Sequence, residues 1–409
     1  MSVLHVIPSL SVAHGGPSKA LPMMARALAE EGVRVDVATT DDDGPGRRLR
    51  EVPQGGAQQR EGFRVFYFRK LTEFYKISPG LLLWLFRQVK EYDVVHVHAV
   101  FSFATLAAAW ACRLRGVPYV VRPLGVLNNW GMNNRRWWLK ALSFRLLDKP
   151  LLDHAAAIHY TSQQEADEAA RLRIRAPDVV IPLGMDLTAL QSLPAPDLFT
   201  SQFPAAAGRP VILFLSRLDP KKNVELLLEA FALLAAAEPA PLLVVAGGGT
   251  PAYLAGLQAR AEALGVARRV LWTGHVEGML KLSLLAAASV YVLPSHSENF
   301  GIALLEAMGA GLPCISTPGV ALATEAAPQN AVLLCAPEPP ALAAALGGLL
   351  GSAPERQRLG AAAAQLARGQ YSAEAAGRAL KQLYARILER RSAATDSADV
   401  AQSGKKEVS

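Results

Sequence analysis

The chain has 409 residues, 51% of them hydrophobic, which is too long for one typical core and apolar enough to bury two. Its three cysteines, Cys112, Cys314 and Cys335, are widely spaced, which argues against a disulfide framework and favours a reducing compartment. We recognise neither a signal-peptide pattern nor a run of the roughly 18 apolar residues that a membrane-spanning helix needs. We therefore expect a cytoplasmic protein of two domains.

The net charge of +7 lies mostly in the first half of the chain: residues 1–186 hold 24 Lys and Arg against 18 Asp and Glu, and the remainder hold 18 against 17. Much of the excess falls in a basic, aromatic segment from Trp130 to Lys149. One hypothesis is peripheral contact with the anionic inner face of the cell membrane. The alternative is a solvated helix whose aromatic side chains point inward. A nucleic-acid partner is not expected.

Short β-branched runs alternate with helical patterns along the chain, which is typical of parallel βαβ units. The expected strands of the first half lie at 4–10, 33–40, 93–100 and 117–123, and those of the second half at 210–216, 242–248, 269–274, 290–295 and 312–317. Residues 191–208, rich in Pro, Ser and Ala, are interpreted as a linker. The sequence thus predicts an α/β fold with domains at 1–190 and 191–372, a helix at 373–391 and a disordered tail at 392–409.

The segment 290–317, VYVLPSHSENFGIALLEAMGAGLPCIST, holds two glutamates in a defined setting. A buried strand, a polar loop and a helix that begins near Gly301 are expected in that order. Glu298 precedes this helix, and Glu306 lies inside it, roughly 12 Å further along the axis at a rise of about 1.5 Å per residue. Free N–H groups and the positive end of the helix dipole suit an anion between them. The alternative is an ordinary helix-start acid and a solvated helix-face residue.

Two further segments have the composition of ligand-binding loops. Arg217 and Lys222 flank the loop after the first strand of the second domain, where two cations could neutralise a departing diphosphate. Gly15 and Gly16 follow the first strand of the chain, and Gly248 lies in a Gly-Gly-Gly turn after residues 242–246. Such glycines let a backbone approach a ligand, although a tight turn alone would also explain them. Acidic residues 41–43 are interpreted as a turn that leads into an exposed loop at 44–62.

These motifs together resemble the retaining glycosyltransferases of family GT4, which have the GT-B fold, in particular enzymes of bacterial exopolysaccharide or lipopolysaccharide assembly. The resemblance covers nearly the whole chain except the tail. It implies two Rossmann-like, doubly wound domains that face each other across a cleft, with the acceptor on the first and the donor on the second. The C-terminal helix would pack back on the N-terminal domain.

The resemblance also implies roles for single residues. In the E-x7-E motif, Glu298 contacts the transferred sugar and Glu306 holds the ribose hydroxyls. Arg217 and Lys222 bind the diphosphate, although Asn223 stands where the family has Gly and Lys221 is a second basic candidate. The remaining donor-side residues implied by position are Gly15, Gly16, Gly248, Asn299, Phe300 and Gly301.

The acceptor side is less well defined by the sequence. Many family members carry a His after the strand at 117–123, and this chain has Leu124 there. His98, Arg122 and Asn128 are the remaining candidates. His96 and His98 share one face of a strand, but no carboxylate or cysteine stands at ligand spacing nearby, so a metal is not expected.

The sequence therefore predicts a retaining hexosyltransferase that needs neither a metal nor another cofactor. It would move a hexose from a UDP- or GDP-linked donor to a growing, polyprenyl-diphosphate-linked surface glycan. One alternative is a nucleotide-sugar epimerase, which needs acid–base groups around the sugar ring. Another is a non-catalytic sugar-nucleotide-binding protein. Hydride transfer is disfavoured because no G-x-G-x-x-G follows the first strand.

Overall fold

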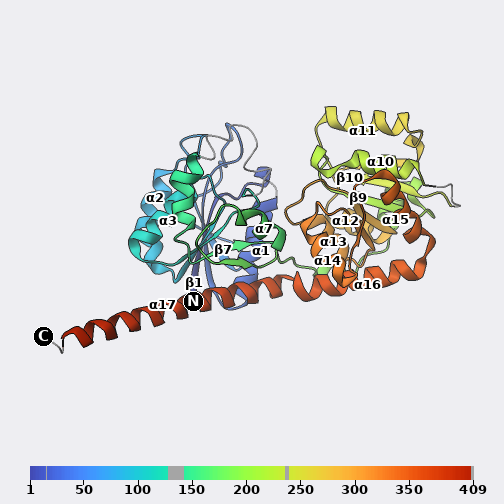
Figure 1. Cartoon of the computed structure of the whole chain (residues 1–409). Helices are drawn as coiled ribbons and strands as arrows, with labels where there is room; N and C mark the ends of the chain where they lie inside the picture. The colour runs from blue at the N-terminus through green and yellow to red at the C-terminus, as the bar shows by residue number, and fades with distance from the viewer. Residues whose placement is uncertain (15, 128–141, 235–238, 407–409) are drawn as a thin grey trace. The chain divides into compact units, whose positions relative to one another are not determined.

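A computed structural model of the chain describes residues 1–14, 16–127, 142–234 and 239–406. The chain divides into two compact units, and each is described by itself (Figure 1). Unit 1 comprises Met1–Met185 together with Ala373–Ser409, and unit 2 comprises Asp186–Ser372. The sequence places the boundary at residue 190, and the structure places it five residues earlier.

Unit 1 is built on an eight-stranded sheet with the order β3-β4-β2-β1-β5-β6-β7-β8. All pairs of neighbouring strands are parallel except β3 with β4. The strands are β1 (Ser2–Ser9), β2 (Arg34–Thr40), β3 (Ala57–Gln59), β4 (Phe63–Phe68), β5 (Val94–His98), β6 (Tyr119–Arg122), β7 (Ala157–Tyr160) and β8 (Asp178–Val180). The segment 44–62 is mostly exposed, as predicted, but it is not a loop throughout, because it contains the short strand β3.

Helices cover both faces of this sheet. They are α1 (Gly16–Glu30), α2 (Pro79–Gln88), α3 (Phe103–Arg115), α6 (Lys149–Leu152), α7 (Gln163–Ala170) and α17 (Ala373–Lys406), with short turns η1 (Val12–His14), η2 (Val89–Glu91) and η3 (Phe144–Asp148). One hydrophobic core lies under α2 and α3. The other includes residues of α1 and α17. Because side chains alternate along a strand, Val3 and Ile7 of β1 belong to the second core and Leu4 and Val6 to the first.

Helix α17 returns from the end of unit 2 and packs on α1 of unit 1 (Figure 1). A Cβ at Gly377 would lie 2.7 Å from the carbonyl oxygen of Ala27, so the two helices approach closely. The sequence predicts a helix that ends at 391 and a disordered tail, but the helix continues to Lys406. The tail has no proline, and alanine recurs through it, so an already formed helix extends at low cost even without an apolar face.

Unit 2 holds a six-stranded, all-parallel sheet with the order β11-β10-β9-β12-β13-β14. Its strands are β9 (Val211–Leu215), β10 (Leu242–Ala246), β11 (Val270–Gly274), β12 (Val290–Leu293), β13 (Cys314–Ser316) and β14 (Leu333–Leu334). Its helices are α8 (Thr188–Gln191), α9 (Asp197–Gln202), α10 (Val224–Ala232), α11 (Pro251–Ala263), α12 (Gly278–Ala287), α13 (Ile302–Gly309), α14 (Ala321–Ala326), α15 (Pro339–Gly351) and α16 (Ala353–Gln370), with turns η4 (Pro204–Ala206), η5 (Pro220–Lys222), η6 (Ala267–Arg269) and η7 (Ala327–Gln329).

The strand order of unit 2 reverses between β9 and β12, which are neighbours in the sheet. Ligands of open α/β sheets bind outside the carboxyl ends of the strands at such a reversal. The corresponding reversal in unit 1 lies between β1 and β5. None of the described helices is both long enough and apolar enough to cross a membrane.

Candidate active site

The loops after β9 and β12 meet at the reversal point of unit 2. The Lys222 ammonium contacts the Glu298 carboxylate, and the His296 N–H donates to the Lys221 carbonyl at 2.8 Å. These loops are 76 residues apart in sequence and meet because their parallel strands pair side by side. The structure thus joins the predicted diphosphate lysine to the predicted sugar glutamate.

Lys222 ends the turn η5, which Asp219 caps by accepting from the Lys221 N–H at 3.0 Å. The next residue, Asn223, has φ +54 and ψ +47, a left-handed conformation that favours Gly and that Asn tolerates well. This explains how Asn223 stands where the family has Gly. Burial and the nearby charge of Arg217 lower the pKa of Lys222 to about 8, against the opposing effect of Asp219.

Glu298 is held through its backbone. Its N–H donates to the Gly319 carbonyl at 2.8 Å, and its own carbonyl accepts from the Ala321 N–H at 3.2 Å. A Cβ at Gly319 would lie 2.4 Å from the carbonyl oxygens of Ser295 and His296, so only glycine fits this crossing. The sequence analysis did not single out Gly319. Gly319 follows β13, and this position points to the site of Glu298 only once β13 is known to pair with β12.

Glu306 lies in the middle of α13 and accepts a hydrogen bond from Lys281 of α12 at 2.8 Å. Both side chains are about a quarter exposed, that of Glu306 at 21% and that of Lys281 at 27%. Lys281 was missed by the sequence analysis, although it is the single charged residue of α12. Each glutamate of the E-x7-E motif therefore faces a lysine from another element.

The glycine turn after β10 divides into two kinds of position. A Cβ at Gly247 would lie 1.8 Å from the Ser216 carbonyl oxygen, and one at Gly249 would lie 2.6 Å from the Leu218 Cβ. Close packing against the loop after β9 explains these two glycines. A Cβ added at Gly248 would meet no described atom within 4 Å, so packing does not explain the glycine at this position, and a donor-side role stays a prediction.

The other predicted donor residues have different surroundings. Gly301 precedes α13 with φ +100, and a Cβ there would lie 3.0 Å from Val320. Phe300 is buried, with its ring 5.9 Å from that of Tyr371, so it belongs to the core of unit 2. Asn299 is partly buried in the same loop, and Gly16 begins α1 with its surface exposed. Gly15 lies outside the described residues.

The acceptor-side candidates are buried or undescribed. His98 is fully buried, and Arg122 is 3% exposed, so neither side chain reaches the surface. Burial lowers the pKa of Arg122 to about 10, and its Nε and Nη1 atoms have no hydrogen-bond partner among the described residues. Asn128 lies outside the described residues. The acceptor roles of these three residues stay predictions.

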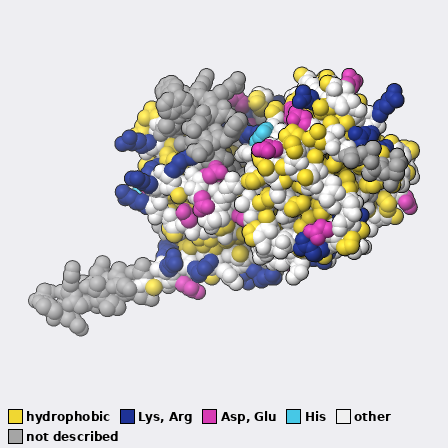
Figure 2. Space-filling view, turned by 45° about the vertical axis from the view of Figure 1, so that its right-hand side comes forward, with side chains coloured by type: hydrophobic (Ala, Val, Ile, Leu, Met, Phe, Trp, Pro, Cys, Tyr) yellow, Lys and Arg dark blue, Asp and Glu magenta, His cyan; other side chains and the backbone are white. Residues whose placement is uncertain are grey.

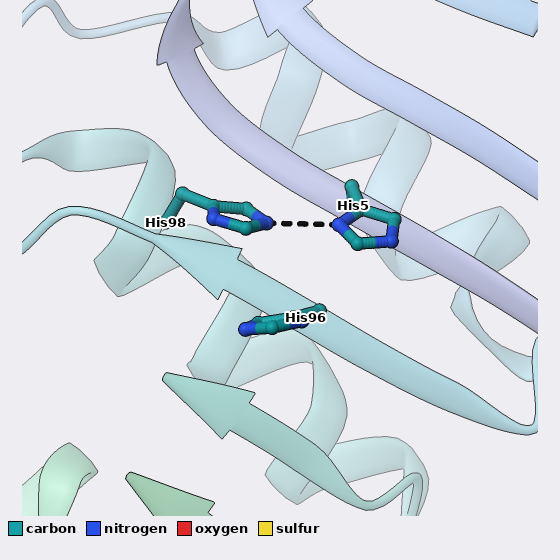
Figure 3. A group of neighbouring side chains, drawn as sticks. All are labelled: His5, His96 and His98. Atoms are coloured by element: carbon teal, nitrogen blue, oxygen red, sulfur yellow. Dashed lines mark hydrogen bonds between the residues drawn. The ribbon is translucent and has the colours of Figure 1, made fainter. Parts of the chain in front are cut away.

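His98 belongs to a buried histidine network on the α1 and α17 side of the sheet (Figure 3). Its Nε2 is 2.8 Å from Nδ1 of His5, whose strand lies beside its own. The His96 ring bonds the Tyr384 hydroxyl at 2.7 Å and His159 at 3.3 Å. The sequence indicated only the pair on β5, because the register that adds His5 and His159 is a property of the folded sheet.

One nitrogen each of His5, His96 and His98 lie within 4.8 Å of one another, close enough for a metal-binding group. Both nitrogens of His96 are already engaged, however, and a divalent cation would face the charge of buried Arg122. Burial, with smaller effects from Arg122, lowers the pKa of His5 and His159 to about 3 and holds those of His96 and His98 well below the usual range. These contacts favour a neutral hydrogen-bonded network.

Two family models match the chain, one in each unit. The glycosyl transferase 4-like domain covers residues 15–184, and the glycosyl transferases group 1 model covers residues 198–366. Together they account for most of the chain. The chain belongs to the GT4-type glycosyltransferases. This confirms the predicted family and enzyme class and decides for transfer over the epimerase and non-catalytic alternatives.

Curated relatives and solved structures agree with this assignment. The chain is 28% identical to a D-inositol 3-phosphate glycosyltransferase of Xylanimonas cellulosilytica, over 93% of each chain. It is also 28% identical to the GDP-mannose:cellobiosyl-diphosphopolyprenol alpha-mannosyltransferase of Xanthomonas campestris, over 80% of this chain and 81% of that one. HepE of Anabaena, solved with UDP and glucose, aligns at a TM-score of 0.73 and 20% identity over 94% of this chain and all of HepE. The predicted GT-B fold is confirmed.

The histidine network of this glycosyltransferase predicts a loss of stability in acid. The four buried histidines stay neutral in the fold, whereas an unfolded histidine binds a proton below about pH 6.5. Their contribution to stability is therefore present above that pH and lost below it, at roughly 1.4 kcal/mol per pH unit for each histidine. Urea unfolding of unit 1 at pH 7.5, 6.5 and 5.5 should show this slope.

A variant pair separates this effect from general acid sensitivity. His159→Asn removes one titrating ring and should reduce the slope. His275→Asn is the matched control, because His275 is 70% exposed in unit 2, and it should leave the slope unchanged. Equal unfolding free energies at the three pH values would contradict the account.

Proposed function

We propose that this glycosyltransferase transfers a hexose, with retention of configuration and without a metal, from a UDP- or GDP-linked donor to a polyprenyl-diphosphate-linked glycan. The observation that carries the donor assignment is the pair of lysine–glutamate contacts at the carboxyl edge of unit 2. They concentrate cations and carboxylates at the position where open α/β sheets bind ligands.

The two contacts suit the parts of a sugar nucleotide. A diphosphate brings acceptor oxygens that can replace Glu298 on Lys222, which frees this carboxylate for the hydroxyls of the sugar. Glu306 is in place for the ribose hydroxyls, and Lys281 fixes its orientation. As the bond to the sugar breaks, Lys222 and Arg217 stabilise the charge that grows on the diphosphate. The ammonium and guanidinium groups thereby take the role that a divalent cation has in other transferases.

The donor and acceptor classes draw on the relatives. HepE was solved with UDP, and the Xanthomonas enzyme is named for GDP-mannose, which supports a nucleoside diphosphate sugar and leaves both bases open. The name of the Xanthomonas enzyme also supports a diphosphopolyprenol-linked acceptor. A lipid-linked acceptor fits a cytoplasmic enzyme that works at the inner face of the membrane.

Donor binding tests this function. Calorimetric titration with UDP, GDP, UDP-glucose and GDP-mannose should identify a ligand, and Glu306→Ala should weaken its binding by about 1–3 kcal/mol, since a hydrogen bond to a charged group is lost. Glu229→Ala is the matched control. Glu229 lies on α10 and, like Glu306, is paired with a basic side chain, that of Arg260 at 2.7 Å. Equal affinities of wild type and Glu306→Ala would move the ribose site elsewhere.

We also propose that one face of unit 1 docks reversibly on an anionic membrane. Trp130, Trp137, Trp138 and their basic neighbours up to Lys140 lie outside the described residues. Among the described residues, the exposed large apolar side chains of this part of unit 1 include Leu71, Phe74, Leu83, Trp110, Leu114, Leu142, Leu146 and Leu147. They lie on α2, α3, η3 and the adjoining loops, and contacts link α2 to α3 and α3 to α6.

Basic side chains accompany these apolar ones. Arg87, Arg113, Arg115 and Arg145 are exposed on the same helices, and Figure 2 shows Lys and Arg side chains at the left edge of unit 1. Apolar side chains that enter the headgroup region, with cations around them, match the chemistry of an anionic lipid surface. Each Lys or Arg near such a surface contributes about 1 kcal/mol.

Co-sedimentation with vesicles tests the docking face. The protein should pellet with phosphatidylglycerol-containing vesicles at low salt and be released by high salt, because the attraction is electrostatic. Leu146→Ser with Arg145→Glu should reduce pelleting. Leu233→Ser is the control, since Leu233 is 58% exposed in unit 2. Equal pelleting with neutral and anionic vesicles would count against the proposal.

A further inference from the structure

A large cavity lies within unit 1 at the carboxyl ends of β2 and β4. Its volume is about 930 Å³, and its lining comes from residues between 41 and 54, after β2, and from Arg69, directly after β4. Because β2 and β4 are parallel neighbours, these two segments meet at one edge of the sheet. Four arginines line the cavity, Arg47, Arg48, Arg50 and Arg69, and we call it the arginine pocket. The sequence alone indicated an acidic turn and an exposed loop here, without a ligand.

Hydrogen bonds hold the wall of the arginine pocket in shape, with Asp41 at their centre. The Asp41 carboxylate accepts from the Lys70 N–H at 2.8 Å and from the Gln54 amide at 3.3 Å. Its carbonyl accepts from the Leu49 N–H at 2.8 Å, and its own N–H donates to the Phe68 carbonyl at 2.9 Å. These bonds tie the loop after β2 to the end of β4. The pocket is therefore formed before a ligand arrives, which lowers the cost of binding.

Three of the four guanidinium groups have no partner within the described part of the chain. Arg48 lies 3.9 Å from the buried carboxylate of Asp41. The side chains of Arg47, Arg50 and Arg69 are exposed and make no hydrogen bond or ion pair with a described residue. These three groups are thus available to a ligand that enters the pocket.

The carboxylates of the pocket do not balance these cations. They belong to Asp41, Asp43 and Glu51. Asp41 is engaged by its own loop, and Asp43 contacts the Ser11 hydroxyl. Among the described residues, three unpaired guanidinium groups therefore stand against one unpaired carboxylate, that of Glu51. Such an excess attracts an anion, and the planar fork of arginine matches the two oxygens of a carboxylate.

The mixture of charges favours a carboxylate on a sugar over a phosphate. A phosphate monoester would bring about two negative charges into a cavity that already holds three carboxylates. A uronic acid brings one, and its hydroxyls can donate to acceptors such as Asp43 and Glu51. Leu49 and Val52 are half-buried and pack on the core of unit 1, so they offer an apolar surface to the C–H face of a sugar ring.

We propose that the arginine pocket binds an acidic oligosaccharide, with a uronate carboxylate on the guanidinium groups of Arg47, Arg50 and Arg69. The volume of about 930 Å³ lies near the upper end of the range for small-molecule pockets, roughly 300–1,000 Å³, and holds more than one sugar ring. The inference rests on the proposed function in that the ligand is part of the glycan that the enzyme extends. The site itself lies within unit 1 and binds without transferring a group.

Calorimetric titration of the full chain with matched probes tests the ligand class. Cellouronate tetrasaccharide, which carries a carboxylate at each C6, should bind, and cellotetraose, its neutral counterpart, should bind at least about tenfold more weakly. Single D-glucuronate and inorganic phosphate should also bind more weakly than the tetrasaccharide, because neither spans the cavity. High salt should weaken the binding of the tetrasaccharide, since exposed charges are screened.

Each probe can overturn one part of the proposal. Equal binding of cellotetraose would remove the carboxylate from the account. Single D-glucuronate that binds as tightly as the tetrasaccharide would show that the ligand is not an oligosaccharide. Inorganic phosphate that binds more tightly than the tetrasaccharide would make the arginine pocket a phosphate site instead.

Variants of the arginines test the location. Arg50→Ala and Arg69→Ala should each weaken the binding of cellouronate tetrasaccharide by about 10–100-fold, since each loses a hydrogen bond between charged groups. Arg69→Lys keeps the charge but loses the fork, so its affinity should lie between wild type and Arg69→Ala. The melting temperatures should match that of the wild type, because these exposed side chains have no partner among the described residues.

Arg60→Ala is the matched control for general loss of positive charge. Arg60 is an exposed arginine of unit 1 outside the pocket, and its side chain donates to Gln58 at 3.4 Å. This variant should bind the tetrasaccharide as the wild type does. Wild-type affinity in Arg50→Ala and Arg69→Ala as well would place the ligand elsewhere and overturn the proposal.

Titration of the same protein with UDP-glucose and GDP-mannose separates this inference from the proposed function. If a donor binds and cellouronate tetrasaccharide does not, the role of the arginine pocket fails while the donor assignment stands. If the tetrasaccharide binds through Arg50 and Arg69 and neither donor binds, the proposed donor class fails while the pocket stands as a site for an acidic glycan.

Discussion

The contact between Lys222 and Glu298 is the interaction on which the rest of unit 2 depends. It requires that β9 and β12 be neighbours, that both strands run in the same direction, and that each end in a loop of fixed shape. Asn223 in the left-handed conformation and Gly319 at a backbone crossing supply that shape. A cation and a carboxylate held this way in a partly buried position are set up for exchange with a charged ligand.

In unit 1, a similar sheet must accommodate several buried histidine side chains. Its central strands carry imidazoles on the face that α1 and α17 cover, and the Tyr384 hydroxyl joins α17 to that network. Losing a buried hydrogen bond is costly, so the bond between His96 and Tyr384 holds α17 on unit 1. His14, in the loop after β1, is 34% exposed, whereas His98, at the end of the neighbouring strand β5, is fully buried.

Local pattern was sufficient for much of the fold. The alternation of β-branched runs and helices predicted both sheets, and Glu298, Glu306 and Lys222 could be selected because a strand end, a polar loop and a helix start follow one another in sequence. The partners of these residues could not be selected. Lys281 lies 25 positions before Glu306, and His5 lies 91 before His96, so their pairing depends on strand order and register, which no local pattern encodes.

Initial-rate transfer by Lys222→Ala and Lys221→Ala tests the central claim that Lys222 is the ammonium group for the leaving diphosphate. With a donor identified by calorimetry, and EDTA added to control for metal dependence, Lys222→Ala should be folded and about 10²–10³-fold slower, since one preorganised electrostatic contact is lost. Lys221→Ala should be much milder, because Lys222 is the lysine that faces Glu298. A crippled Lys221→Ala beside a normal Lys222→Ala, or two variants with the wild-type rate, would contradict the account.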